Sequence, residues 1–154
     1  MSPKRGAGNL RPRFFGDDGN HIHVPEPSAS QENLEQFVIK STKLFNKKKF
    51  FRFHEVLEQV WLETKGPERE FLQGLIQVGA AFVHFYRGRR HEGTLNLIQR
   101  GSNYLRKYPA IHMQINVKKL LTDLESVAEI IRKNNGFPAR FRFPKIEVLE
   151  ETHA

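Results

Sequence analysis

Two side chains that can do chemistry occupy the edge of an apolar helical face in residues 50–64. His54 and Glu58 are four residues apart, so at about 100° per residue they lie on neighbouring turns of one helix face. That face borders the apolar arc that contains Phe50 and Trp61. A carboxylate there is costly unless it is paired, hydrogen-bonded or bound to a metal ion. The pair suits metal ligation, or a Glu58 general base oriented by an imidazole.

A second polar stripe follows in residues 71–86, which contain no Asp, Glu, Lys or Arg. Gln73, Gln77 and His84 fall within a stripe about 40° wide on an otherwise apolar helix. If the two stripes face each other, they form one polar pocket beneath Trp61. The candidate pocket residues are then His54, Glu58, Trp61, Gln73, Gln77 and His84, with His54, Glu58 and His84 as candidate ligands of a divalent metal.

The same side chains have a plainer interpretation. They form a hydrogen-bond network that fixes helix register, or the second stripe faces water. Polar networks in bundles are commoner than catalytic ones, so we favour this interpretation and expect no cofactor, with a divalent metal as the alternative. Glu55 lies on the opposite arc with Arg52 and is expected to be exposed. His54-Glu55-x-x-Glu58 lacks the second His of the zinc-protease motif, and whether the protein is an enzyme stays open.

The net charge indicates a different class of partner. The chain has 25 Lys and Arg against 17 Asp and Glu, a net charge of +8. The excess is concentrated in residues 1–16 and 130–146, which contain no acid, and such ends favour flexible arms or solubility. Basic residues alternate with aromatic ones in Arg140-Phe141-Arg142-Phe143, a pattern that can pair with phosphate and stack on bases.

An RNA-binding module is therefore the alternative function. Its candidate residues are Lys47, Lys48, Lys49, Arg87, Arg89, Arg90, Arg140 and Arg142. Against it stands the favoured expectation that the tail phenylalanines pack on the protein and that the charges are solvated. A third possibility is a protein-interaction unit, including a homo-oligomer that forms through an apolar face.

The elements that must position these residues are helices. Periodic apolar residues predict helices at about 31–46, 50–64, 67–88 and 90–107, and a fifth helix whose apolar face starts at Met113. Ser30 is the expected N-cap of the first helix, and Asn134-Asn135-Gly136 ends the last. No convincing strand is visible. The prediction is an all-α antiparallel bundle of about five helices. It divides into a flexible, basic Gly/Pro-rich arm (1–31), a bundle domain (32–134) and an extended tail (135–154).

Several classes of protein are excluded. Cys is absent, which rules out disulfides, thiolate metal sites and cysteine nucleophiles. The chain shows neither a secretory signal nor an apolar run long enough for a membrane span, so we expect a cytoplasmic protein without membrane contact. A phosphate-binding glycine loop and a nucleophile elbow are also missing.

The order of these motifs resembles one family over about residues 32–107. The segments that carry the resemblance are residues 50–61, the run Gln73-Gly74-Leu75-Ile76-Gln77, His84 and Glu92-Gly93-Thr94. They are similar to the domain-of-unknown-function family 309. The resemblance implies a small all-helical domain and makes the six candidate pocket residues its defining positions. It implies no activity, because none is established for the family.

Overall fold

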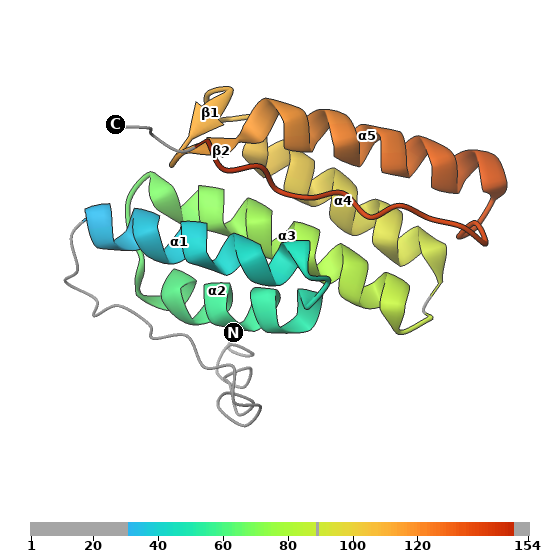
Figure 1. Ribbon diagram of the computed structural model, residues 1–154, viewed down its shortest axis with the longest axis horizontal. Coiled ribbons are helices and arrows are strands. Elements are labelled where there is room, and N and C mark those ends of the chain that lie inside the picture. The colour runs from blue at the N-terminus through green and yellow to red at the C-terminus, as the bar shows by residue number, and fades with distance from the viewer. Residues whose placement is uncertain (1–30, 89, 150–154) are drawn as a thin grey trace, which may run out of the picture.

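The computed structural model describes residues 31–88 and 90–149. The predicted arm, apart from Gln31, lies outside these residues, and so do Ser30 and Arg89. The described chain is a bundle of five helices with one small antiparallel strand pair (Figure 1), which confirms the predicted fold class. The helices are α1 (Gln31–Asn46), α2 (Phe50–Glu63), α3 (Glu68–Tyr86), α4 (His91–Leu105) and α5 (Val117–Asn134). Within these ranges no helix is both long and apolar enough to cross a membrane.

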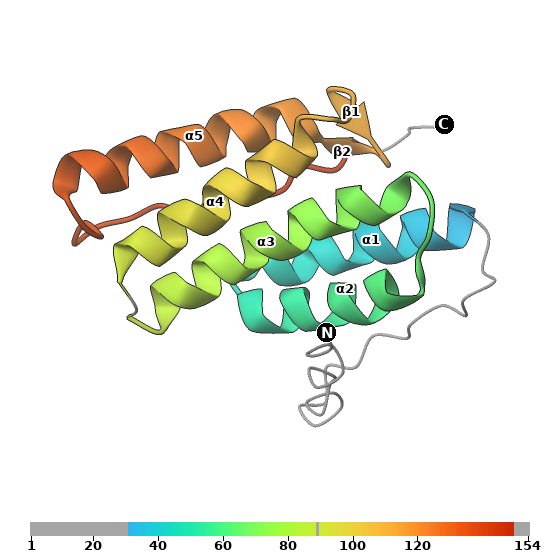
Figure 2. The same cartoon turned by 180° about the vertical axis from the view of Figure 1, so that it is seen from behind.

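Helix α3 lies at the centre of the bundle (Figures 1 and 2). It packs against α2 on one side and α4 on the other, while α1 covers α2 and α5 covers α4. Four phenylalanines fill the core between α1, α2 and α3 with edge-on and tilted ring contacts, namely Phe45, Phe50, Phe53 and Phe82. All four are fully buried, so the apolar faces of these three helices pack against one another.

Glycine sets the spacing between α3 and α4. A Cβ atom at Gly101 would lie 2.8 Å from Val78 Cγ2 and 3.0 Å from the backbone oxygen of Gly74. A Cβ atom at Gly74 would in turn lie 2.9 Å from the side chain of Leu105. The two backbones therefore approach more closely than larger residues at these positions allow. Gly74, part of the Gln-Gly-Leu-Ile-Gln run, has a packing role here.

One predicted element was wrong at its start. Met113, predicted on the last helix, lies instead in a tight hairpin between β1 (Ile111–His112) and β2 (Ile115–Asn116). Met113 and Gln114 both have positive φ, 52° and 64°, as a two-residue hairpin turn of this kind requires. Helix α5 begins only after Asn116, whose side chain accepts a hydrogen bond from the Lys119 amide. Met113 is nevertheless buried, so its apolar side chain correctly indicated burial but did not indicate a helix.

The chain after α5 returns along the bundle. Asn135 takes the left-handed conformation, φ 54°, and ends the helix as predicted. The tail then runs beside the helices in an extended form (Figure 1). Asn46 fixes it to the end of α1, because its side-chain amide donates to the Ile146 carbonyl and its oxygen accepts from the Ile146 amide, at 3.0 and 2.7 Å. The Leu149 amide donates to the Gln114 carbonyl at 2.7 Å.

Candidate functional site

His54 lies on α2 beside α3. A Cβ atom at Gly79 of α3 would be 3.6 Å from His54 Cβ, so the two helices are in contact at this residue. The side chain is half-buried, and burial lowers the pKa of its imidazole. Burial thus favours the neutral imidazole of His54, which is the form that can bind a metal ion.

The polar stripe of α3 turns toward α4. A Cβ atom at Gly93 of α4 would lie 3.0 Å from Nδ1 of His84, and one at Gly101 would lie 3.3 Å from Cβ of Gln77. On the α3 wheel these two residues stand about 140° to 160° from Gly79, the position that meets α2. The structure thus separates His84 and Gln77 from His54 by the body of α3 itself.

The remaining candidate pocket residues are half-buried and belong to different surroundings. The guanidinium of Arg69 lies over the Trp61 ring, 3.9 Å from its centroid. Arg69 also donates to the carbonyls of Trp61 and Thr64, both at 2.9 Å, which ties the end of α2 to the start of α3. Glu58 and Gln73 are half-buried on α2 and α3. Within residues 31–88 and 90–149 no three His, Asp or Glu side chains are grouped to hold a metal ion.

Helix α2 departs from the predicted sorting in another way. Glu55 and Arg52, predicted on the solvent-facing arc, are only 6% and 7% exposed. The prediction of an exposed Glu55 was therefore wrong. Its assumption was a helix with a single buried face, whereas α2 packs against both α1 and α3 and buries a wider arc.

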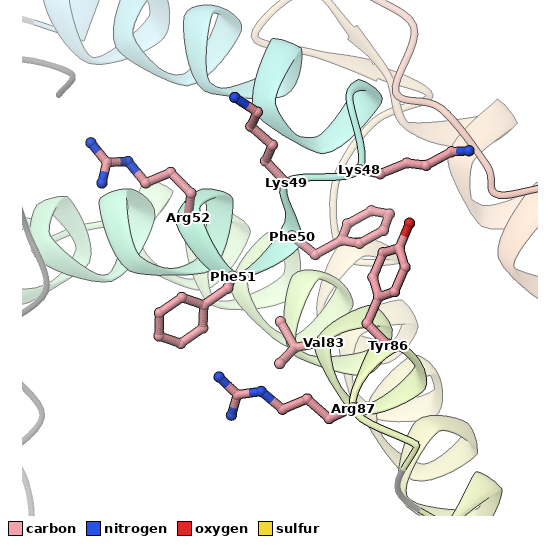
Figure 3. Close-up of a pocket in the computed structure, with 8 residues that line it drawn as sticks. All are labelled: Lys48, Lys49, Phe50, Phe51, Arg52, Val83, Tyr86 and Arg87. Atoms are coloured by element: carbon pink, nitrogen blue, oxygen red, sulfur yellow. The ribbon is translucent and has the colours of Figure 1, made fainter. Parts of the chain in front are cut away.

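A hollow of about 390 Å³ lies where α2 begins and α3 ends (Figure 3). Its walls come from the loop between α1 and α2, from the first turn of α2 and from the end of α3. The lining residues are Lys48, Lys49, Phe50, Phe51, Arg52, Val83, Tyr86 and Arg87. Four of the eight are basic and none is acidic, so the hollow has a cationic rim around apolar and aromatic walls.

A second hollow, about 580 Å³, adjoins the first and shares Lys48 with it. It forms between the end of α1 and the returning tail. Its lining residues are Asn46, Lys48, Arg140, Phe141, Arg142, Phe143 and Lys145. The tail brings three basic side chains, about a hundred residues distant in sequence, next to the loop that contains Lys48. We call the two hollows together the basic groove.

Six cations of the basic groove form no ion pair with an acidic residue that the structure describes. In the part of the chain that the structure describes, no ion pair joins Lys48, Lys49, Arg87, Arg140, Arg142 or Lys145 to an acid. Arg90 differs, because it pairs with Glu92 at 3.3 Å and lines neither hollow. Lys47 is exposed in the same loop as Lys48. The structure therefore gathers five of the predicted nucleic-acid residues, namely Lys48, Lys49, Arg87, Arg140 and Arg142.

The aromatic rings of the tail are engaged with the bundle, although Phe143 also lies 5.3 Å from the Lys48 ammonium. Phe141 and Phe143 pack on Phe85, with ring centroids 4.8 and 5.2 Å apart, so they hold the tail to the bundle, as the competing interpretation of the tail predicted. The exposed rings of the groove are Phe51 and Tyr86, which are 39% and 55% exposed. Neither ring, nor Arg52, is among the nucleic-acid residues predicted from the sequence. The signal was available, since Phe51-Arg52 and Tyr86-Arg87 repeat the aromatic-basic pairing of the tail.

Lys48 holds its place in the groove at a conformational cost. Its φ of 67° is left-handed, a region that glycine occupies more readily. The local reason is the end of α1, where the Lys48 amide donates to the Phe45 carbonyl and the Lys49 amide to the Leu44 carbonyl, at 2.9 and 2.8 Å. A lysine where glycine fits better, at the junction of two basic hollows, is a feature that points to use of its charge.

Comparison with known families places this geometry in context. Residues 38–97 match the family model described as Domain of unknown function (DUF309), which confirms the resemblance. No curated protein matches the chain. The matched range contains every residue that lines the first hollow, whereas Arg140, Arg142 and Lys145 of the second lie beyond it.

Proposed function

We propose that this member of a family without established activity binds nucleic acid through the basic groove. The observation that carries the proposal is the convergence of three separate segments on one surface. The loop 47–49, the end of α3 and the tail together supply basic side chains around two adjoining hollows that no acidic residue lines. Six of these cations, namely Lys48, Lys49, Arg87, Arg140, Arg142 and Lys145, are exposed, and such a cluster is the expected footprint of a phosphate backbone.

The physical basis is the release of counterions. Each phosphate that a lysine or arginine neutralises frees condensed cations, so affinity falls steeply as salt rises. Arginine suits this task, since its planar guanidinium forms two parallel hydrogen bonds with phosphate oxygens. The groove offers Arg87, Arg140 and Arg142 for such contacts.

The polar pocket between α2 and α3 receives less support as a site for a ligand or metal. His84 lies beside Gly93 of α4 and His54 lies beside Gly79 of α3, contacts that do not support a space shared by the two histidines. Thr94 likewise uses its hydroxyl between the helices, as a donor to the Ala81 carbonyl at 3.1 Å. These contacts favour a structural role for Gln77 and His84 in holding α3 to α4.

The test is a binding titration of the full chain with labelled single-stranded RNA and DNA of about 12 nucleotides, within the range that one small binding surface covers. We expect binding that weakens steeply between about 50 and 200 mM salt. The variant Lys49→Glu/Arg87→Glu should abolish it. The matched control Arg100→Glu/Lys118→Glu changes the same charge at exposed positions that line neither hollow and should bind like the wild type.

Two outcomes would contradict the proposal. The first is absence of binding to either nucleic acid at low salt. The second is displacement of the bound strand by polyglutamate of equal charge at equal concentration, which would identify an acidic protein surface as the better partner.

A further inference from the structure

The first hollow of the basic groove separates aromatic walls from a charged rim. Figure 3 shows Val83 between Phe51 and Tyr86, with Lys49 and Arg52 toward one edge and Arg87 toward the opposite edge. Its volume of about 390 Å³ falls at the small end of the range of ~300–1,000 Å³ that is usual for small-ligand sites. A flat apolar group fits the interior, and negative charge fits the rim.

Tyr86 is held in a fixed position by the tail. Its ring stacks on Phe143 with centroids 5.4 Å apart and an angle of 22° between the planes, and it also contacts Phe50 at 5.8 Å. More than half of the side chain nevertheless stays exposed. A ring that is fixed by neighbours and exposed to solvent can stack on a ligand without losing side-chain freedom on binding.

Phe51 contributes a second ring with a cation beside it. The Arg87 guanidinium lies 5.1 Å from the centroid of the Phe51 ring. Such a pair offers a π-surface and a phosphate ligand within the reach of one nucleotide. A second cation–ring pair adjoins Tyr86, because the Lys48 ammonium lies 5.3 Å from the centroid of Phe143, the ring on which Tyr86 stacks.

From these observations we infer that the substrate class is single-stranded nucleic acid, with one unpaired base stacked on Tyr86 inside the first hollow. The inference rests on the proposed function and specifies it. The strand continues past Lys48, which lines both hollows, and its next phosphates meet Arg140, Arg142 and Lys145. A duplex should bind more weakly than a single strand, because its paired bases are stacked on each other and do not present a face to Tyr86.

The experiment compares probes that share phosphates and differ in bases. The full chain is titrated with a labelled single strand of about 12 nucleotides, with an abasic strand of the same length and with the matching duplex. Because stacking of one base typically contributes a factor of about 5 to 140 in affinity, the abasic strand should bind weaker by at least that lower factor. RNA and DNA versions of the single strand show whether the sugar matters.

Two variants assign the effect to one ring. Tyr86→Phe keeps the ring and should bind as the wild type does. Tyr86→Leu keeps apolar packing on Phe143 but has no ring, and should bind the normal strand about as weakly as the wild type binds the abasic one. Neither variant should alter the salt dependence, because neither removes a cation.

The outcomes distinguish this inference from the proposed function. Equal affinity for the normal, abasic and duplex probes, with steep salt dependence, would overturn base stacking and leave phosphate binding intact. Absence of binding to all three would overturn both. Since the abasic comparison uses the wild-type chain, it decides the matter even if Tyr86→Leu proves unstable.

Discussion

Neutralising the tail of the basic groove should flatten the salt dependence of nucleic-acid binding while leaving the fold unchanged. Arg140 and Arg142 are both exposed, and neither side chain makes a hydrogen bond or ion pair within the described residues. The tail is held instead by Phe141, Phe143 and the Asn46 clamp on Ile146. The variant Arg140→Gln/Arg142→Gln should therefore change the free energy of unfolding by no more than about 0.5 kcal/mol for each substitution.

The size of the effect follows from the number of phosphate contacts removed. For a single strand, each neutralised phosphate contributes about 0.7 to the slope of log affinity against log salt concentration. Two lost contacts reduce that slope by about 1.4. Over a fourfold rise in salt, from about 50 to 200 mM, the wild type should then lose about sevenfold more affinity than the variant.

Fluorescence anisotropy with a labelled single strand at four or more salt concentrations measures both slopes. The control variant Arg100→Gln/Lys118→Gln has the same net charge and should retain the wild-type slope, since these residues line neither hollow. Parallel slopes for wild type and the Arg140→Gln/Arg142→Gln variant would refute the reasoning, because they would place the phosphates elsewhere. A slope reduced equally by the control would show that only net charge matters.

Three further predictions concern single positions. Lys48→Gly relieves a left-handed lysine, so it should keep or raise the melting temperature while it weakens nucleic-acid binding at about 50 mM salt. Because one phosphate contact is lost, the wild type should lose about threefold more affinity than this variant between about 50 and 200 mM salt. A fall in both melting temperature and affinity would contradict a charge role for Lys48. Gly101→Ala places a methyl group 3.0 Å from the Gly74 carbonyl oxygen. Although alanine gains about 1 kcal/mol in helix propensity, this variant should lower the melting temperature in thermal unfolding by roughly 2–4 °C. The control Asn96→Ala, at an exposed position of the same helix, should not lower it. Burial lowers the pKa of His54 in the folded state, so the unfolded chain binds a proton more readily and the free energy of unfolding should fall as pH decreases below about 6.5. Urea unfolding of His54→Asn should show a smaller fall in this free energy than the wild type. An unchanged fall would assign the pH dependence to other groups.

The helices could be predicted from sequence because their causes are local. The Gly66-Pro67 break, the apolar periodicity and the Asn135 cap fixed the ends of α2, α3 and α5 at their expected places. Met113 was misplaced for a physical reason, since burial in a hairpin and burial on a helix leave the same apolar residue in the sequence. The positive φ values of the turn and the pairing of β1 with β2 distinguish the two.

The candidate site was less predictable, because a helical wheel gives the direction of a side chain relative to its own axis and not to its neighbours. Gln77 and His84 do share one stripe, as expected, but that stripe meets Gly101 and Gly93 of α4. Glu55 was mispredicted for the same reason. Helix α2 packs against both α1 and α3, which buries an arc that a single partner would leave in water.

By itself, then, the amino-acid sequence determined the five helices, the positions of their polar stripes and the existence of three basic segments, because periodicity, caps and charge are properties of neighbouring residues. Only the tertiary structure decided which stripe faces which helix and that the tail returns to lie beside the loop 47–49. The physical reason is that contacts such as Asn46 with Ile146 join residues a hundred positions apart. Their formation depends on how the whole core packs, and it is this packing that turns separate charges into one groove.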